Sequence, residues 1–405
     1  MGMNQTPASE RVHIAFFGRR NAGKSSIINA VTGQDLAIVS DVKGTTTDPV
    51  YKTMELLPLG PVMVIDTPGI DDEGELGALR IKKSYQILNK TDIAVLVIDS
   101  TIGMTAVEKN CIRRFKDKGI PYLIVYNKCD LLTAPNYSFD DTQIYVSAAT
   151  GKNITQLKES IAALKPEDTH LFPIIGDLIN PLDLVLLVVP IDKAAPKGRL
   201  ILPQQQTIRD ILEHGASSLV VRDTELRETL QKLTSAGIVP KMVVTDSQAF
   251  AHVSKDTPPE IPLTSFSILF ARYKGDLETS IRGVAALQTI QNGDKILIAE
   301  GCTHHRQCND IGTVKIPNWI RSYTGKQPDF EFTSGTEFPD DLSSYKMVVH
   351  CGGCMLNERE MKYRIACCKD QNIPITNYGI LIAQVTGILK RSLEPFPEIL
   401  KILSS

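Results

Sequence analysis

Short apolar runs recur through the first part of the chain, each bounded by polar or glycine-rich turns. Five of these runs predict buried strands: Val12–Phe17, Val62–Ile65, Ile93–Ile98, Tyr122–Tyr126 and Ile144–Val146. Helical stretches such as Ser25–Thr32 and Val107–Lys118 separate them. Because strands that alternate with helices form a parallel sheet covered on both faces, residues 1–168 are predicted to be one α/β domain.

The alternation continues beyond a proline-containing linker at Leu164–Pro173. Residues 174–260 predict strands and helices in turn: Leu184–Ile191, Gln205–His214, Ser218–Arg222, Glu225–Ala236 and Met242–Thr245. Prolines gather again in Val253–Pro262, ahead of a third block at residues 263–405. That block predicts strands Lys295–Ala299 and Met347–His350 and a C-terminal helix from about Leu381. We therefore expect two smaller α/β domains after the first.

Length and charge narrow the functional classes. A chain of 405 residues exceeds the roughly 250–300 residues of a single core. Its net charge of -2 does not have the basic balance of a nucleic-acid-binding protein, so no nucleic-acid partner is expected. The longest apolar run, Leu182–Ile191, falls short of the roughly 20 residues of a membrane span, and Met1–Arg11 lacks the apolar stretch of a signal peptide. We expect a cytoplasmic protein without a membrane partner, whose eight cysteines stay reduced.

The segment Gly18–Ser25 fits the pattern G-x-x-x-x-G-K-S. It follows a predicted strand and opens a predicted helix, which is the context that a phosphate-binding loop requires. Its glycines allow backbone N–H groups to surround phosphate oxygens, and the helix N-terminus adds positive potential. Lys24 would reach the β- and γ-phosphates and Ser25 would bind Mg²⁺. Taken alone, this pattern also fits an ordinary glycine-rich turn.

Three further motifs follow, each at the end of a predicted strand. Asp66-Thr67-Pro68-Gly69 offers a carboxylate that can hold Mg²⁺ through water and a Gly69 N–H for the γ-phosphate. Asn127-Lys128-Cys129-Asp130 places Asp130 to accept two hydrogen bonds from guanine, which selects GTP over ATP. Ser147-Ala148 would close over the base. Because α/β sheets bind ligands at the carboxyl ends of their strands, the four motifs together predict a P-loop GTPase domain with a parallel sheet.

The finer pattern resembles the TrmE–Era branch of GTPases. Gly44-Thr45-Thr46-Thr47-Asp48 resembles the first switch segment of that branch, and the resemblance assigns Thr46 to Mg²⁺. Asn21 matches the asparagine that binds K⁺ in potassium-activated members. Ile70 stands where Ras-like enzymes have the glutamine that positions water. We therefore predict slow hydrolysis of GTP to GDP that is faster with K⁺ than with Na⁺.

The residues expected to act in catalysis are Lys24, Thr46, Asp66 and Gly69. The residues expected to bind the nucleotide are Asn21, Ala22, Gly23, Lys24, Ser25, Ser26, Thr45, Thr46, Asp66, Gly69, Asn127, Lys128, Asp130, Ser147 and Ala148.

Six of the eight cysteines lie after residue 300. Cys302-Thr303-His304-His305 and His350-Cys351-Gly352-Gly353-Cys354 each follow a predicted strand, so both groups would meet at one end of a sheet if these strands are neighbours. Cys351 and Cys354 have C-x-x-C spacing and can bind one metal centre, with Cys302 as a third thiolate. An iron–sulfur cluster, a structural zinc site, a redox dithiol and unrelated buried cysteines all remain open at this point.

A TrmE–Era-like GTPase domain followed by a C-x-H…H-C-x-x-C block resembles the [FeFe]-hydrogenase maturation GTPase family, HydF. The block reads Cys302-Thr303-His304, then 45 residues, then His350-Cys351-Gly352-Gly353-Cys354. The resemblance covers essentially the full length of the chain.

This resemblance implies a [4Fe-4S] cluster on Cys302, Cys351 and Cys354, with the fourth iron position open or held by an exchangeable ligand. His304 and His350 match the motif histidines without being assigned as ligands. The family is a scaffold and carrier that delivers a transient diiron precursor to the apo-[FeFe]-hydrogenase, after receiving parts from two radical-SAM maturases. Residues 174–260 resemble its dimerisation domain, so a homodimer is expected, and residues 263–405 would bind the cluster. GTP-dependent switch loops could gate partner binding.

Two other functions compete with this one. A TrmE–Era-type GTPase for RNA modification or ribosome assembly would need an RNA-binding region, but no G-x-x-G loop with basic flanks follows residue 174. A GTPase with a structural zinc module would need the same cysteines, and metal analysis distinguishes it from the iron–sulfur protein. The sequence leaves open the fourth cluster ligand, the oligomer size, the nucleotide state that favours partners and any coupling of hydrolysis to transfer.

Overall fold

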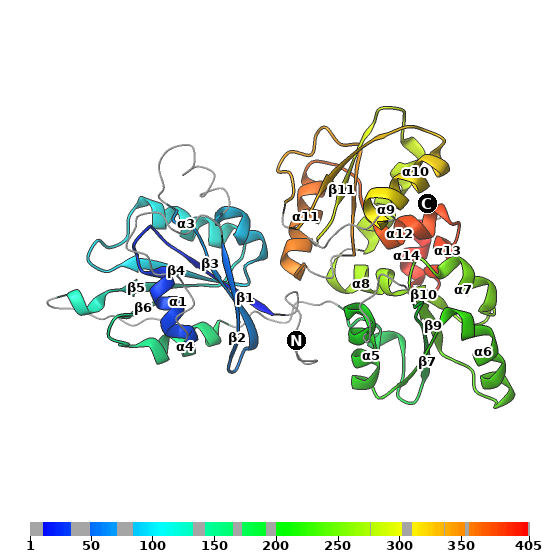
Figure 1. Ribbon diagram of the computed structural model, residues 1–405, viewed down its shortest axis with the longest axis horizontal. Helices are drawn as coiled ribbons and strands as arrows, with labels where there is room; N and C mark the ends of the chain where they lie inside the picture. Colours follow the sequence, from blue (N-terminus) through cyan, green and yellow to red (C-terminus); the bar gives the residue numbers. More distant parts are fainter. Residues whose placement is uncertain are drawn as a thin grey trace. The chain divides into compact units, whose positions relative to one another are not determined.

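The computed structural model describes residues 11–33, 49–70, 84–132, 142–164, 172–191, 200–275, 277–301, 310–335, 337–352 and 356–403. The chain divides into two units, Met1–Thr169 and His170–Ser405. Figure 1 shows the elements of each unit.

The first unit is built on a six-stranded sheet. Its strands are β1 (Val12–Phe17), β2 (Val50–Leu56), β3 (Gly60–Asp66), β4 (Ile93–Asp99), β5 (Tyr122–Asn127) and β6 (Gln143–Tyr145), in the order β2-β3-β1-β4-β5-β6. Every neighbouring pair is parallel except β2 and β3. The parallel α/β fold predicted from the sequence is confirmed, and each of the five predicted strands is present within two residues of its expected ends.

Strand β2 is the element of this sheet that the apolar pattern did not predict. Its sequence mixes polar and apolar residues, and every side chain but that of Leu56 is at least partly exposed. It pairs antiparallel with β3 at the edge of the sheet. Its pattern is that of an edge strand rather than that of a buried run.

Helices cover both faces of this sheet (Figure 1). Helices α1 (Lys24–Thr32) and α4 (Ile154–Ala163) contribute Ile27, Val31 and Leu157 to the core on one face. Helix α3 (Ala106–Asp117) contributes Cys111 and Phe115 to the core on the other. Two short 3-10 turns, η2 (Leu88–Lys90) and η3 (Cys129–Leu131), complete the described elements of the unit.

The second unit contains two four-stranded parallel sheets. The first consists of β7 (Leu184–Val188), β8 (Ser217–Val221), β9 (Met242–Thr245) and β10 (Leu263–Ser265), in the order β10-β9-β7-β8. The second consists of β11 (Lys295–Ala299), β12 (Asp329–Thr333), β13 (Met347–His350) and β14 (Ile375–Asn377), in the order β12-β11-β13-β14.

The α-helices of this unit are α5 (Leu202–Glu213), α6 (Leu226–Ser235), α7 (Phe250–Asp256), α8 (Phe266–Lys274), α9 (Leu277–Val284), α10 (Ile316–Thr324), α11 (Glu358–Asp370), α12 (Tyr378–Val385), α13 (Leu389–Ser392) and α14 (Pro397–Ile402). The shorter helical turns are η4 (Gly176–Leu178), η5 (Asp223–Glu225), η6 (Ala285–Thr289) and η7 (Ile311–Lys315). The predicted C-terminal helix begins at Tyr378 and is divided into three pieces, the first break falling at Gly387 with its φ of +75°. Within the described ranges, no helix is long and apolar enough to cross a membrane.

One hydrophobic core joins the two sheets of the second unit. It contains Leu187 and Val244 from the first sheet, Ile298 and Val349 from the second, and Leu269 from α8, which follows β10 directly. The two smaller α/β layers are therefore packed together through shared side chains rather than held apart by a linker.

Candidate functional site

The loop from Gly18 to Ser25 follows β1 and leads directly into α1. Gly18 has φ +149°, and a Cβ atom there would lie 2.3 Å from the carbonyl oxygen of Val97. Gly23 has φ +91°, and a Cβ there would lie 2.1 Å from Nδ2 of Asn127. These two positions of the motif therefore admit only glycine, which explains why the loop can fold so closely against β4 and β5.

The end of α1 that faces this loop is open to an anion. The helix has no side-chain N-cap and no acidic residue in its first turn, so its first N–H groups lack intrahelical partners. Lys24 is 8% exposed, and its Nζ donates hydrogen bonds to the carbonyl oxygens of Gly18 and Arg19, each at 3.0 Å. An ammonium group and a free helix N-terminus at one point form a site suited to phosphate groups.

Ser25 and Asp66 meet beside this site. The Ser25 hydroxyl donates to Oδ2 of Asp66 at 2.6 Å, whereas Oδ1 of Asp66 is buried without a hydrogen-bond partner. Burial raises the pKa of Asp66, although the hydrogen bond from Ser25 and the charges of Lys24 and Lys52 lower it. A hydroxyl and a buried carboxylate with an unused oxygen fit the ligand preference of Mg²⁺. These residues therefore fit the metal that the sequence predicted.

Asn127 joins the phosphate loop to the loops expected around the base. Its Nδ2 donates to the carbonyl oxygen of Ala22 at 3.1 Å, and its Oδ1 accepts from the backbone N–H of Ala148 at 3.1 Å. Ser147 is fully buried, and its Oγ accepts from the N–H of Thr150 at 3.2 Å. One amide side chain thus holds three of the four motifs in register.

Lys128 forms an ion pair that the motifs did not predict. Its Nζ lies 2.6 Å from Oδ2 of Asp99, the last residue of β4. Hydrogen bonds from Lys128 and Thr101 lower the pKa of Asp99 more than its burial raises it. The pairing of β4 with β5 places Asp99 opposite Asn127, the residue before Lys128. A correct prediction of the strand order would therefore have brought Asp99 close to Lys128.

The remaining predicted nucleotide residues lie around the same edge of the sheet. Asp130 is exposed in η3, Asn21 is exposed with φ +61°, Ser26 is half-buried in the first turn of α1, and Gly69 is half-buried. Thr45 and Thr46 lie outside the described residues.

The cysteine block lies at the carboxyl end of the second unit's β11–β13 pair. These strands are parallel neighbours, with Ala299 opposite His350. Both cysteine groups were predicted to lie at one end of a sheet on the condition that the two strands are neighbours, and they are. Cys351 donates its N–H to the carbonyl oxygen of Ala299 at 3.0 Å, and its Sγ accepts from the N–H of Gly301 at 2.9 Å. The segment that leads into residue 302 therefore adjoins Cys351 directly.

Gly301 also packs against Leu356, which follows the Cys351–Cys354 motif in the sequence. A Cβ there would lie 2.6 Å from Cγ of Leu356, so a larger residue would have to displace the Leu356 side chain. Cys302, His304 and Cys354 themselves lie outside the described residues, and no group of three metal-binding side chains is found among the residues that are described. A half-buried thiol that receives a backbone N–H, with both cysteine-bearing segments beside it, fits the thiolate donors of an iron–sulfur cluster.

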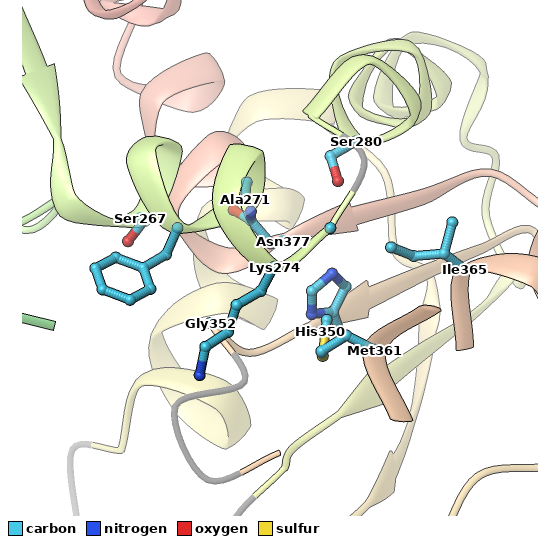
Figure 2. Close-up of a pocket in the computed structure, with 11 residues that line it drawn as sticks. Ser267, Ala271, Lys274, Ser280, His350, Gly352, Met361, Ile365 and Asn377 are labelled. Carbon is cyan, nitrogen blue, oxygen red and sulfur yellow. The ribbon is translucent and has the colours of Figure 1, made fainter. Parts of the chain in front are cut away.

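His350, drawn in Figure 2, is described and 5% exposed. Its Nδ1 lies 2.5 Å from the carbonyl oxygen of Cys351, which can only accept, so Nδ1 carries the proton and Nε2 is the unprotonated nitrogen. Burial is the main reason that the pKa of His350 falls to about 4, and the nearby charge of Arg364 lowers it further. His350 is therefore a neutral imidazole at neutral pH.

Near the same edge, Tyr378 and Glu300 were missed by sequence reasoning. The Tyr378 hydroxyl donates to Oε1 of Glu300 at 3.3 Å, and burial raises the pKa of Tyr378. Gly312 packs against both groups, since a Cβ there would lie 2.3 Å from Oε1 of Glu300. Glu300 stands two residues before Cys302, but Tyr378 is 78 residues further along the chain, so no spacing rule reveals the pair.

Three models of known families match successive parts of the chain. Residues 13–128 match a family model described as 50S ribosome-binding GTPase. Residues 174–275 match the hydrogen maturase F dimerization domain, and residues 278–395 match the hydrogen maturase F tetramerization domain.

Curated relatives resemble this chain over part of its length. The tRNA modification GTPase MnmE of Nitrosomonas europaea is 31% identical over 156 residues, which are 38% of this chain and 34% of that protein. The MnmE of Burkholderia cenocepacia is 33% identical over 159 residues, with the same two shares of 38% and 34%. The chain thus spans about a third of the length of these relatives.

Among solved structures, Era in complex with MgGDPNP and 16S ribosomal RNA is 20% identical with a TM-score of 0.35, covering 52% of this chain and 91% of that one. Aquifex aeolicus Era bound to GDP and AlF4- is 19% identical with a TM-score of 0.35, covering 60% and 97%. The two maturase models together match more than half of this chain. The chain therefore belongs to the hydrogen maturase F family, with a GTPase domain ahead of the dimerization and tetramerization domains of that family.

Proposed function

We propose that the first unit hydrolyses GTP to GDP and phosphate. The observation that carries this proposal is the pairing of Ser25 with a buried Asp66 whose second oxygen has no partner, beside Lys24 and an uncapped helix N-terminus. Lys24 would exchange its two backbone carbonyl contacts for phosphate oxygens. Ser25, Thr46 and Asp66 would hold Mg²⁺, which would stabilise the negative charge on the phosphate groups.

Hydrolysis is proposed to be slow and activated by K⁺ at Asn21. Ile70 is 3% exposed and packs in the core, so the position after the Asp66–Gly69 motif presents no polar group to a water molecule. A rate measured in potassium chloride should exceed the rate in sodium chloride at equal ionic strength. Equal rates of GTP hydrolysis in the two salts would show that Asn21 does not bind an activating K⁺. The variant Lys24→Ala should lose hydrolysis in both salts and serves as the background.

We also propose that the second unit carries a [4Fe-4S] cluster on Cys302, Cys351 and Cys354. The N–H of Gly301 on Cys351 Sγ and the pairing of β11 with β13 support this proposal. Backbone N–H groups that point at a thiolate stabilise its negative charge, as cluster ligands require. Three protein thiolates leave one iron position free for an exchangeable ligand, and His350 with its unprotonated Nε2 is the described candidate nearest to Cys351 in sequence.

In this proposal the protein is a scaffold that holds a diiron precursor and delivers it to the apo-[FeFe]-hydrogenase, after two radical-SAM maturases supply the parts. The maturase F family supports a role in hydrogenase maturation, and its dimerization and tetramerization domains support an oligomer. GTP would act by gating partner binding. A Lys24→Ala protein that delivers precursor at the normal rate would rule out obligatory gating.

Anaerobic reconstitution with iron and sulfide tests the cluster. We expect about four irons and four sulfides per chain, with an EPR signal after reduction, in line with the composition of the cluster. The triple variant Cys302→Ala, Cys351→Ala, Cys354→Ala should lose both, whereas Cys368→Ala should retain them because Cys368 is buried in the core with its pKa raised to about 12. Stoichiometric zinc without an EPR signal would assign these cysteines to a structural zinc module.

A further inference from the structure

The backbone N–H of Gly69 is expected from the sequence to contact the γ-phosphate, and it has no hydrogen-bond partner in the described part of the chain. The residues on either side of it are fixed by backbone hydrogen bonds. The N–H of Ile70 donates to the carbonyl oxygen of Gly18 in the phosphate-binding loop at 3.4 Å, and the N–H of Thr67 donates to that of Phe16 in β1 at 3.4 Å. Gly69 is therefore held beside the phosphate-binding loop with its N–H available to a ligand.

The carbonyl oxygen of Pro68 belongs to the same peptide group as this N–H. The peptide bond is trans, so its C=O and N–H lie in one plane and point in opposite directions, and neither can turn without the other. The buried hydroxyl of Ser84 donates to the Pro68 oxygen at 3.1 Å. Thr67 Oγ1 also lies 3.3 Å from that oxygen, but its single proton goes to the carbonyl oxygen of Phe16, only 2.7 Å away. Ser84 is therefore the side chain that sets the direction of the Gly69 N–H.

Ser84 belongs to a packed segment, which allows it to orient a neighbouring peptide group. The ring of Tyr85, the next residue, lies against α3: the guanidinium carbon of Arg114 is 3.9 Å from the ring centroid, and Nδ2 of Asn110 is 3.5 Å from the hydroxyl. Ile87 is 3% exposed in the core to which α3 contributes. A hydroxyl group on a loose segment would follow the peptide, whereas this one is held in place by α3 and the core.

We propose that Ser84 is a positioning residue for the γ-phosphate. Its hydroxyl orients the Pro68–Gly69 peptide so that the N–H of Gly69 faces that group, which makes the site bind GTP in preference to GDP. Ser84 acts through the peptide and needs no contact with the nucleotide. Because GDP lacks the γ-phosphate, its affinity does not depend on Ser84. This inference rests on the proposed GTP hydrolysis and adds to it a residue that lies outside every motif.

Calorimetric titration of the full-length protein with GDP and with GDPNP, a GTP analogue that is not hydrolysed, tests this role. Ser84→Ala should bind GDPNP about three- to tenfold more weakly, the effect expected for one hydrogen bond between neutral groups, and should bind GDP as the wild type does. Ser84→Thr keeps the hydroxyl and should bind GDPNP more tightly than Ser84→Ala.

Thr91→Val is the matched control. It removes another fully buried hydroxyl, which donates to the carbonyl oxygen of Ile87 at 2.7 Å and lies before the amino end of β4, whereas the nucleotide motifs follow the carboxyl ends of the strands. The Thr91→Val protein should bind both nucleotides as the wild type does.

The ratio of the GDPNP and GDP affinities separates positioning from a loss of stability, because a loosened fold would weaken the binding of both nucleotides. An unchanged ratio in Ser84→Ala, whether both affinities are kept or both fall, would overturn the role of Ser84 and leave GTP hydrolysis standing. A Ser84→Thr protein that binds GDP normally, but GDPNP no better than Ser84→Ala, would also overturn it. If the wild type binds neither nucleotide, the proposed hydrolysis of GTP fails and the role of Ser84 fails with it.

Discussion

At the scale of single residues, Asp99 shows how a side chain outside every motif can prepare the nucleotide site. Its 2.6 Å ion pair fixes the ammonium of Lys128, whose backbone is itself held in a left-handed conformation with φ +64°. The pair is largely shielded, since the side chain of Asp99 is 13% exposed. Lys128 is therefore positioned before any ligand arrives, which reduces the entropy lost on binding.

Asp99→Asn should weaken GDP binding about tenfold, because hydrogen bonds to charged groups contribute roughly 1.5–3 kcal/mol. Titration with a fluorescent GDP analogue measures this change. Asp117→Asn, which alters an exposed aspartate at the end of α3, is the matched control and should leave the affinity unchanged. Wild-type affinity in Asp99→Asn would show that Lys128 is positioned by other contacts.

Asp246 makes a second prediction at this scale. It is mostly buried, its carboxylate accepts a 2.9 Å hydrogen bond from Gln204, and burial raises its pKa from 3.8 to about 6. The folded protein thus binds the proton of Asp246 more tightly than the unfolded chain does. The contribution of Asp246 to the free energy of unfolding is therefore largest below pH 3.8 and is lost as the pH rises to about 6.

Asp246→Asn keeps an acceptor for Gln204 but removes the titration. At pH 7.5 we expect the variant to be more stable than the wild type by up to about 3 kcal/mol, with the difference shrinking towards pH 4. Urea unfolding of both proteins at several pH values measures the difference. A gap that does not depend on pH would show that Asp246 titrates normally.

At the scale of elements, the contact between α9 and β14 depends on Gly283. A Cβ there would lie 1.9 Å from the backbone carbonyl oxygen of Ile375, so the helix approaches the strand more closely than any other residue would permit. In an exposed helix the change from glycine to alanine stabilises by roughly 1 kcal/mol. At Gly283 the change to alanine should instead destabilise the protein, because the backbone atoms of Ile375 cannot move aside as a flexible side chain can.

Gly283→Ala should destabilise the second unit by roughly 2–4 kcal/mol, in the range of overpacked cores and strained contacts. Thermal unfolding with a probe in residues 170–405 measures the loss. Arg282→Ala, an exposed change in the same helix, should cost less than about 0.5 kcal/mol. A stable Gly283→Ala protein would mean that α9 can shift away from β14.

The elements also show what the sequence could and could not predict. Buried strands such as β1, β9, β11 and β13 were predicted with their exact ends because nearly all of their residues are buried and most are apolar. Strands β2 and β12 were missed because edge positions permit polar residues, as Asp329 and Glu331 illustrate. The first of these strands completes the nucleotide sheet, so its loss from the prediction left the edge beside Asp66 incomplete.

The same distinction applies to the site. Motif spacing predicted Lys24, Ser25, Asp66 and Asn127 because each has a fixed chemical role beside phosphate or base. It missed the Asp99 contact with Lys128 and the Tyr378–Glu300 pair because such contacts depend on which strands are neighbours. Pairing information is absent from a local pattern, so positioning residues of this kind need a structure.

At the scale of the whole molecule, each unit has its own sheets and its own cores. Units of this kind are expected to fold independently. Produced separately, residues 1–169 should hydrolyse GTP within about threefold of the full-length rate at matched nucleotide, and residues 170–405 should take up the cluster with the same stoichiometry. Phosphate release and iron analysis test the two halves. A large fall in the rate of GTP hydrolysis or in the iron content would show that one unit depends on the other.

The single core beneath both sheets of the second unit has a consequence for cooperativity. Residues matched by the dimerization domain, such as Leu187 and Val244, pack in the same core as Ile298 of β11 and Val349 of β13. Segments that share a core open to hydrogen exchange together, and a ligand that binds the closed form slows exchange throughout the shared unit. Loading the cluster should therefore protect backbone amides of β7 and β9 from deuterium, so that a cofactor at one sheet steadies the sheet that lies in the matched dimerization domain.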